Sequence, residues 1–156
     1  MQKITTFLTY NDQAEQAARL YVSIFEDQGR VVDTVKGPDG KVMTVTFDLF
    51  GTRYVALNAG PSPDFHFSNG VSLMVMCEDQ AELDRYWTKL TADGGSEIMC
   101  GWCKDKFGLP WQIVPRALMD MIASKDRAAA GRAMQAMMQM KKLDLATLQG
   151  AFDGKS

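Results

Sequence analysis

Three cysteines and one histidine carry the most reactive side chains of this sequence. Cys100 and Cys103 form a C-x-x-C pair, a spacing at which one thiolate can attack a disulfide and the other can resolve it. Redox pairs of this kind place the first cysteine at the N-terminus of a helix, whereas this pair precedes a predicted strand or turn. We therefore expect reduced hairpin cysteines, with redox chemistry, or a zinc site shared with Cys77, as the alternatives.

The single histidine, His66, excludes any site that needs two histidines from one chain, such as a two-histidine zinc or iron centre. No Ser-His-Asp arrangement, phosphate-binding loop or pair of carboxylates can be recognised, and Asp48 stands alone on the polar side of its predicted strand. The sequence therefore assigns no catalytic residue and no metal ligand, and we expect no cofactor.

The composition of the chain is that of a globular protein. Its 156 residues are 46% apolar and 23% charged, with a formal net charge of −2. That charge does not favour binding to nucleic acid or to an anionic membrane surface. The longest apolar run, Leu73–Cys77, is too short for a membrane helix, and three cysteines are too few for a disulfide framework. We predict a cytoplasmic protein without nucleic-acid or membrane partners.

The first half of the chain predicts the order β-α-β-β-β. A strand rich in β-branched and aromatic residues leads to Asn11 and Asp12, which we expect to cap a helix with an apolar stripe that ends before Gly29. Turn sequences at Gly37–Gly40 and Gly51–Thr52 separate the strands that follow. The predicted strands are Ile4–Tyr10, Arg30–Lys36, Val42–Leu49 and Arg53–Ala59.

The second half repeats this order after a joint rich in proline and glycine, Gly60–Gly70. The tetrapeptide Asp-Gln-Ala-Glu occurs at Asp12–Glu15 and again at Asp79–Glu82, each time where a strand meets a helix. We expect a helix over Asp79–Thr91, and Lys104–Lys106 as a solvated hairpin tip. The predicted strands are Val71–Cys77, Ser96–Cys100, Trp102–Asp105 and Leu109–Val114.

The remaining segment, Ala117–Phe152, is predicted to be helical, with methionine-rich stripes interrupted at Lys125–Asp126. We expect these helices to cover the sheets or a dimer partner, because methionine side chains adapt to the shape of their neighbours. The alternative role for the methionines is a copper(I) site. The predicted organisation is one domain over residues 1–116, with modules at about 1–59 and 70–116. A helical tail over 117–156 is expected to pack on that domain or on a partner.

Several local sequences carry a resemblance to a known family. They are Leu57–Pro61, Cys77–Gln80, Cys100–Trp102, the run from Lys104 to Pro115, and Met137–Asp144. Together with the paired modules, they resemble the vicinal oxygen chelate superfamily of glyoxalases, dioxygenases and bleomycin-resistance proteins. The nearest likeness is its PhnB-like branch, which bears the label 3-demethylubiquinone 3-methyltransferase. The resemblance implies an α+β fold in which two βαβββ modules form glyoxalase-like half-barrels, with a C-terminal helical extension.

In catalytic members, each module supplies two metal ligands from its concave face. The resemblance places these positions near Thr5, Asn58, Ser72 and Gln112, of which only Gln112 is a residue type that the metal-binding members use. The sequence also lacks a glycine-rich turn between strand and helix that would hold S-adenosylmethionine.

We therefore predict a protein that binds a small molecule and lacks the usual metal ligands. The main alternative is an enzyme of the same superfamily, a metal-dependent lyase, transferase or dioxygenase, or one that uses Cys103 or His66. A purely structural or interaction module is the third interpretation. A homodimer is expected by analogy. The predicted ligand pocket consists of Asn58, Ser72, Trp102, Cys103, Phe107, Trp111 and Gln112.

Overall fold

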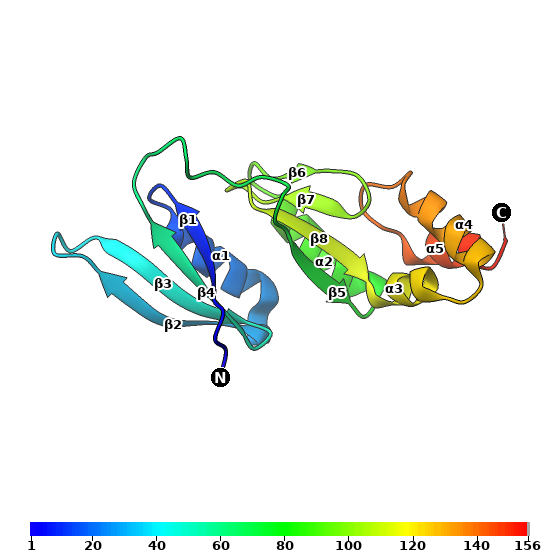
Figure 1. Cartoon of the computed structure of the whole chain (residues 1–156), viewed down its shortest axis with the longest axis horizontal. Helices are drawn as coiled ribbons and strands as arrows, with labels where there is room; N and C mark the ends of the chain where they lie inside the picture. The colour runs from blue at the N-terminus through cyan, green and yellow to red at the C-terminus, as the bar shows by residue number, and fades with distance from the viewer. Residues whose placement is uncertain (156) are drawn as a thin grey trace. The chain divides into compact units, whose positions relative to one another are not determined.

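The computed structural model describes residues 1–155 and divides the chain into two compact units, Met1–His66 and the part that begins at Phe67. Each unit contains a four-stranded mixed sheet with a helix against it (Figure 1). The predicted α+β fold with two βαβββ modules is confirmed.

The first module has strand order β1-β4-β3-β2, in which β1 and β4 are parallel and the other pairs antiparallel. Helix α1 packs on one face of this sheet because its apolar stripe, which includes Ala17, Tyr21 and Ile24, is fully buried against the strands. The elements are β1 (Thr6–Tyr10), α1 (Ala14–Phe25), the 3-10 helix η1 (Glu26–Gln28), β2 (Gly29–Lys36), β3 (Val42–Leu49) and β4 (Thr52–Asn58).

The second module repeats the topology with the order β5-β8-β7-β6, and its helix α2 buries Leu83, Trp87 and Leu90 against the sheet. Its hairpin is much shorter than the one in the first module: β6 has 2 residues and β7 has 3, where β2 and β3 have 8 each. The elements are β5 (Leu73–Cys77), α2 (Gln80–Thr91), β6 (Ser96–Glu97), β7 (Trp102–Lys104) and β8 (Pro110–Pro115).

Up to residue 155, the tail forms three helices, α3 (Arg116–Ala123), α4 (Arg127–Met137) and α5 (Leu145–Phe152). The break near Lys125–Asp126 occurs as predicted, because the Asp126 carboxylate accepts a hydrogen bond from the Ala129 N–H and caps α4. Asp144 caps α5 in the same way, and the Arg132 side chain of α4 donates to the carbonyls that end α5. The predicted tail extended to Ser156, which lies outside the described residues.

The start of α1 differs from the prediction that Asn11 or Asp12 would cap it. The capping position is Gln13, and its side chain makes no capping bond. Instead, the Oδ1 atom of Asn58 accepts a hydrogen bond of 2.8 Å from the Ala14 N–H, and its Nδ2 atom donates one of 3.0 Å to the Val42 carbonyl. A side chain distant in sequence thus satisfies the helix end and joins it to the β2–β3 hairpin.

The segment between α4 and α5 lies against the short hairpin of the second module. The backbone N–H groups of Cys100 and Gly101 donate to the carbonyls of Met140 (2.7 Å) and Lys141 (2.9 Å). The Gln80 carboxamide of α2 also binds this segment, since it donates to the Leu143 carbonyl and accepts from the Leu145 N–H. Leu143 is fully buried as a result.

Gly101 makes this contact possible. At the corresponding register position of the first module, Val45 pairs with Ala56 and fills the core with its side chain. The carbonyl of Gly101 accepts from Ile113, and a Cβ atom added at Gly101 would lie 2.9 Å from Leu143 Cδ1. The Leu143 side chain therefore fills the space that a hairpin side chain fills in the first module.

Replacing Gly101 by alanine tests this packing. Gly101 has φ +80°, so the left-handed backbone costs about 1–2 kcal/mol, and the clash with Leu143 adds about 1–3 kcal/mol. Gly108→Ala is the matched control, because its φ is +85° and no atom lies within 4 Å of the added Cβ. We expect urea unfolding to show the larger loss of stability for Gly101→Ala, and trypsin to cleave faster after Lys141 and Lys142. Equal losses in the two variants would contradict the packing role of Gly101.

Candidate functional site

One face of the second sheet is free of its helix and gathers part of the predicted pocket. Trp102 pairs with Gln112, and Gln112 pairs with Met74, so these three side chains lie on the same side of the sheet. Val75 and Cys77 are buried on the opposite side, beneath α2, whereas Met74 and Met76 are each 45% exposed. We call the side with Ser72, Met74, Trp102 and Gln112 the open face of the second sheet.

Ser72 and Gln112 meet on this open face. The Nε2 atom of Gln112 donates a hydrogen bond of 2.8 Å to Ser72 Oγ, and both side chains are half-buried. Trp102 is half-buried beside them in the sheet. The open face therefore combines a neutral hydrogen-bonding pair with an aromatic ring and flexible thioether side chains.

The other predicted pocket residues lie elsewhere. Cys103 and Trp111 pair with each other on the face of the sheet that α2 covers, and each is almost completely buried. Phe107 is half-buried in the loop between β7 and β8, with the Lys106 ammonium 5.5 Å from the centre of its ring. Asn58 belongs to the first module, where its carboxamide holds α1 and the β2–β3 hairpin together.

The run from Lys104 to Trp111 contributes Asp105, Leu109 and Trp111 to the core of the second module. Asp105 was expected at a solvated hairpin tip, and this expectation is wrong, since only 2% of the residue is exposed. Its carboxylate accepts hydrogen bonds from the N–H groups of Phe107 (2.9 Å) and Leu109 (3.1 Å), and from Trp111 Nε1 (2.9 Å). The turn therefore folds inward around Asp105, because the carboxylate supplies the acceptors that its backbone N–H groups need.

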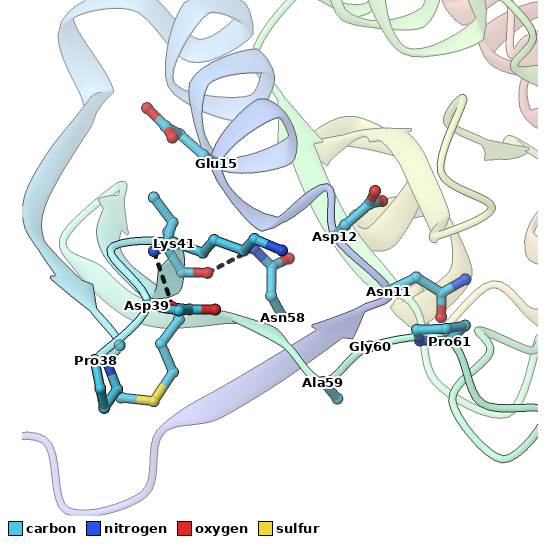
Figure 2. A pocket seen from close by; sticks show the side chains of 13 residues that line it. Asn11, Asp12, Glu15, Pro38, Asp39, Lys41, Asn58, Ala59, Gly60 and Pro61 are labelled. Carbon is cyan, nitrogen blue, oxygen red and sulfur yellow. Dashed lines mark hydrogen bonds between the residues drawn. The ribbon is translucent and has the colours of Figure 1, made fainter.

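Asn58 also borders a cavity of about 920 Å³ in the first module. Figure 2 shows this cavity between the start of α1, the β2–β3 turn and the segment after β4. Its rim carries three carboxylates and the ammonium of Lys41, and the Asp39 carboxylate accepts from the backbone N–H of Lys41. The cavity is lined mainly by exposed residues and by none of the other predicted pocket residues.

The four positions implied by the resemblance do not fit a divalent metal ion. Thr5, Asn58, Ser72 and Gln112 supply only neutral oxygen and nitrogen atoms, and the amides of Asn58 and Gln112 are engaged in hydrogen bonds. The strand register also shows which positions of the two modules are equivalent. Asn58 pairs with Tyr10 as Pro115 pairs with Cys77, so Asn58 is equivalent to Pro115, and Val55 is equivalent to Gln112. Among residues 1–155, no group of three or more His, Cys, Asp or Glu side chains could hold a metal ion.

The cysteines and the histidine are poorly placed for chemistry. The thiols of Cys77 and Cys103 are free and completely buried, and burial, followed by nearby carboxylates, raises the pKa of each to about 12. Cys100 precedes the turn at Gly101 and has φ +63°, so it does not begin a helix. His66 is exposed in the joint after β4, with its Nδ1 atom 3.1 Å from the Pro63 carbonyl.

A charged cluster that the sequence analysis did not identify lies on the first sheet, away from α1. Asp48 is only 8% exposed and binds the guanidinium groups of Arg30 and Arg53 at 2.9 Å each. The hydrogen bonds from Arg53, and then those from Arg30, hold the pKa of Asp48 below its usual range against the opposing effect of burial. The alternation of Val42–Leu49 placed Asp48 on the polar side, but its partners come from two other strands.

Comparisons with known proteins cover both modules. A family model described as 3-demethylubiquinone-9 3-methyltransferase matches residues 2–114. The chain is 32% identical to the PhnB protein of Bacillus cereus, over 73% of this chain and 99% of that one, with a TM-score of 0.67. It is 33% identical to a protein from Staphylococcus aureus, over 74% and 98% of the two chains, with a TM-score of 0.34.

A more distant structure supports the fold alone. Protein PA1353 of Pseudomonas aeruginosa is 18% identical, with 71% of this chain and 95% of that one covered and a TM-score of 0.54. No curated protein matches the chain. Within residues 1–155, no helix has the length and apolar character needed to cross a membrane.

The buried carboxylate of Asp105 leads to a first prediction for this part of the chain. Asp105→Asn replaces one acceptor oxygen by an N–H group that faces hydrogen-bond donors, so we expect a loss of about 2 kcal/mol of unfolding free energy in urea. Asp120→Asn, on the exposed side of α3, makes the same chemical change and should alter stability by less than about 0.5 kcal/mol. Similar stabilities for the two variants would show that the Asp105 network contributes little.

The buried thiols lead to a second prediction. At pH 8, iodoacetamide should modify Cys100 first and leave Cys77 and Cys103 protected, whereas all three should react in urea, as read by mass spectrometry. Because the folded-state pKa values of about 12 lie above the ordinary value of 9.0, the two buried thiols stabilise the fold below pH 9. This contribution should disappear as the pH rises from 9 to 12. Rapid native-state labelling of Cys103 would contradict its placement.

Proposed function

The chain belongs to the 3-demethylubiquinone-9 3-methyltransferase family of the vicinal oxygen chelate superfamily, and from that premise we propose that it binds a small molecule. The proposed site is the open face of the second sheet. Its ligand is a small, uncharged and partly apolar molecule, held without a divalent metal ion.

The observation that carries this proposal is the Gln112–Ser72 hydrogen bond among apolar side chains. Gln112 keeps its carbonyl oxygen and one amide N–H for a ligand, since the bond to Ser72 uses one N–H of Nε2. Trp102 offers a flat apolar surface on the same face, and Met74 offers a polarisable side chain that adapts to the shape of its neighbour. A few polar groups within an apolar surface are typical of small-molecule sites.

Methyl transfer, which the family description names, finds no support in the fold. The described part of the chain forms two mixed four-stranded sheets, whereas the common S-adenosylmethionine-dependent enzymes use a doubly wound parallel sheet with a glycine-rich turn. The superfamily's metal-dependent enzymes need charged or imidazole donors, and the four implied positions here are neutral. The thiol of Cys103, with its raised pKa, and the exposed His66 do not favour covalent or acid–base catalysis either.

The proposal includes a homodimer in the cytoplasm. Exposed methionines of the tail, such as Met119, Met134 and Met138, are better suited to a covered surface than to water. The three free cysteines suit a reducing compartment. In this proposal, residues 1–116 form the paired-module domain, and the tail from residue 117 completes the second module.

Native mass spectrometry of protein purified without chelators tests this function. We expect the mass of a dimer, a retained small molecule, and no stoichiometric zinc, manganese, nickel or iron in elemental analysis of the same sample. Gln112→Ala should reduce the retained molecule about tenfold, because it removes the polar group that orients the ligand. Gln16→Ala, on the exposed side of α1, is the matched control and should retain the ligand as the unmodified protein does.

Two outcomes would contradict the proposal. One tightly bound divalent ion per subunit would favour the enzyme alternative and would mean that other residues supply its ligands. Equal ligand retention by Gln112→Ala and Gln16→Ala would place the site away from the open face of the second sheet.

A further inference from the structure

The charged cluster of the first sheet consists of two arginines that share one carboxylate. Arg30 donates from Nε (3.2 Å) and Nη2 (2.9 Å) to Asp48 Oδ2. Arg53 donates from Nε to Oδ1 (2.9 Å) and from Nη2 to Oδ2 (3.2 Å). Because two cations share one anion, the cluster keeps a net charge of about +1.

The arginines retain donors that can reach a ligand. Each guanidinium has about five N–H groups, of which the bonds to Asp48 use two. The side chains of Arg30 and Arg53 are 73% and 45% exposed, whereas that of Asp48 is only 11% exposed. The carboxylate therefore lies beneath the guanidinium groups, and the surface presents cationic donors.

Arg53 is held in place by its backbone as well as its side chain. Its N–H donates to Gln2 Oε1 and its carbonyl accepts from Gln2 Nε2, at 3.0 Å each. The side chain is fixed by Asp48 at the same time. A guanidinium that is already ordered loses little conformational freedom when it binds an anion, so the cluster is preorganised for such a ligand.

An apolar strip lies on the same side of the sheet. Phe7 pairs with Val55, and Thr9 pairs with Leu57, along the parallel strands β1 and β4. Successive side chains of a strand point to opposite faces, and Ala56 of β4 faces the helix. Arg53, Val55 and Leu57 therefore share the other face of the sheet, which carries the charged cluster. Phe7 is 57% exposed, and Val55 and Leu57 are half-buried. The surface thus runs from cationic donors to apolar side chains.

We propose that this surface of the first sheet is a second binding site, for a free amphiphilic molecule with one oxyanionic group and a short hydrocarbon chain. The oxyanion, a carboxylate or a phosphonate, accepts hydrogen bonds from the free N–H groups of Arg30 and Arg53, which suit planar and bidentate acceptors. The hydrocarbon chain lies along Phe7, Val55 and Leu57. This site differs from the neutral face proposed for the second sheet in both its residues and its ligand class.

NMR titration with sodium octanoate tests the proposal. We expect saturable shifts of the Nε–Hε resonances of Arg30 and Arg53 and of the Phe7 amide, whereas 1-octanol and octylammonium should leave the arginine resonances unchanged. Arg30→Gln should weaken octanoate binding about tenfold, since one charge-assisted donor is lost. Arg19→Gln, which removes an exposed arginine of α1, is the matched control and should bind octanoate normally.

Other results would overturn the proposal. These are an octanoate affinity unchanged in Arg30→Gln, arginine shifts with 1-octanol equal to those with octanoate, or no saturation in the millimolar range. Flotation with anionic vesicles that octanoate does not compete away would assign the cluster to a membrane surface instead.

The thermal midpoint of Arg30→Gln, compared with that of Arg19→Gln, separates lost binding from lost folding. Gln112→Ala should leave octanoate binding unchanged, so this test is independent of the site on the second sheet.

Discussion

In each module, one carboxamide side chain joins the start of the helix to another segment of the same unit. Asn58 joins Ala14 of α1 to Val42 of the β2–β3 hairpin, and Gln80 joins α2 to Leu143 and Leu145 of the tail. Backbone groups at the ends of helices and strands lack partners within their own element, so a donor and acceptor on one side chain can satisfy two elements at once. Each carboxamide therefore adds two hydrogen bonds that hold the start of its helix against that segment.

The most distinctive local sequences of the chain organise its core. Asp105 draws the β7–β8 turn inward by accepting from two backbone N–H groups and from Trp111. Gly101, inside the C-x-x-C pair, leaves the space that Leu143 fills. The hairpin of the second module is shorter than that of the first, and Leu143 of the tail is fully buried against it.

The faces that the two sheets turn away from their helices differ in chemistry, although the sheets share one topology. The second sheet presents an amide–hydroxyl pair with thioether and aromatic side chains, and the first presents paired guanidinium groups over a buried carboxylate. Neither face has the clustered carboxylate and imidazole donors that a divalent ion needs to offset its loss of hydration. The chain thus keeps the framework of its superfamily while the surface positions of the strands carry other chemistry.

Local pattern determined the order of the strands, the module helices, the internal repeat and the family, because side-chain periodicity and turn residues act over a few neighbouring positions. The predicted strand Ser96–Cys100 was wrong in its length, since the structure has a strand only over Ser96–Glu97. The same locality limited what could be inferred. The cap at Asn58, the burial of Asp105 and the Arg30–Asp48–Arg53 cluster join residues that are distant in the sequence. Strand register decided that Cys103 and Trp111 lie beneath α2 while Trp102 and Gln112 face away, since a shift of one residue reverses every side chain. The sequence by itself therefore determined the elements and their order, and only the tertiary structure decided which side chains meet.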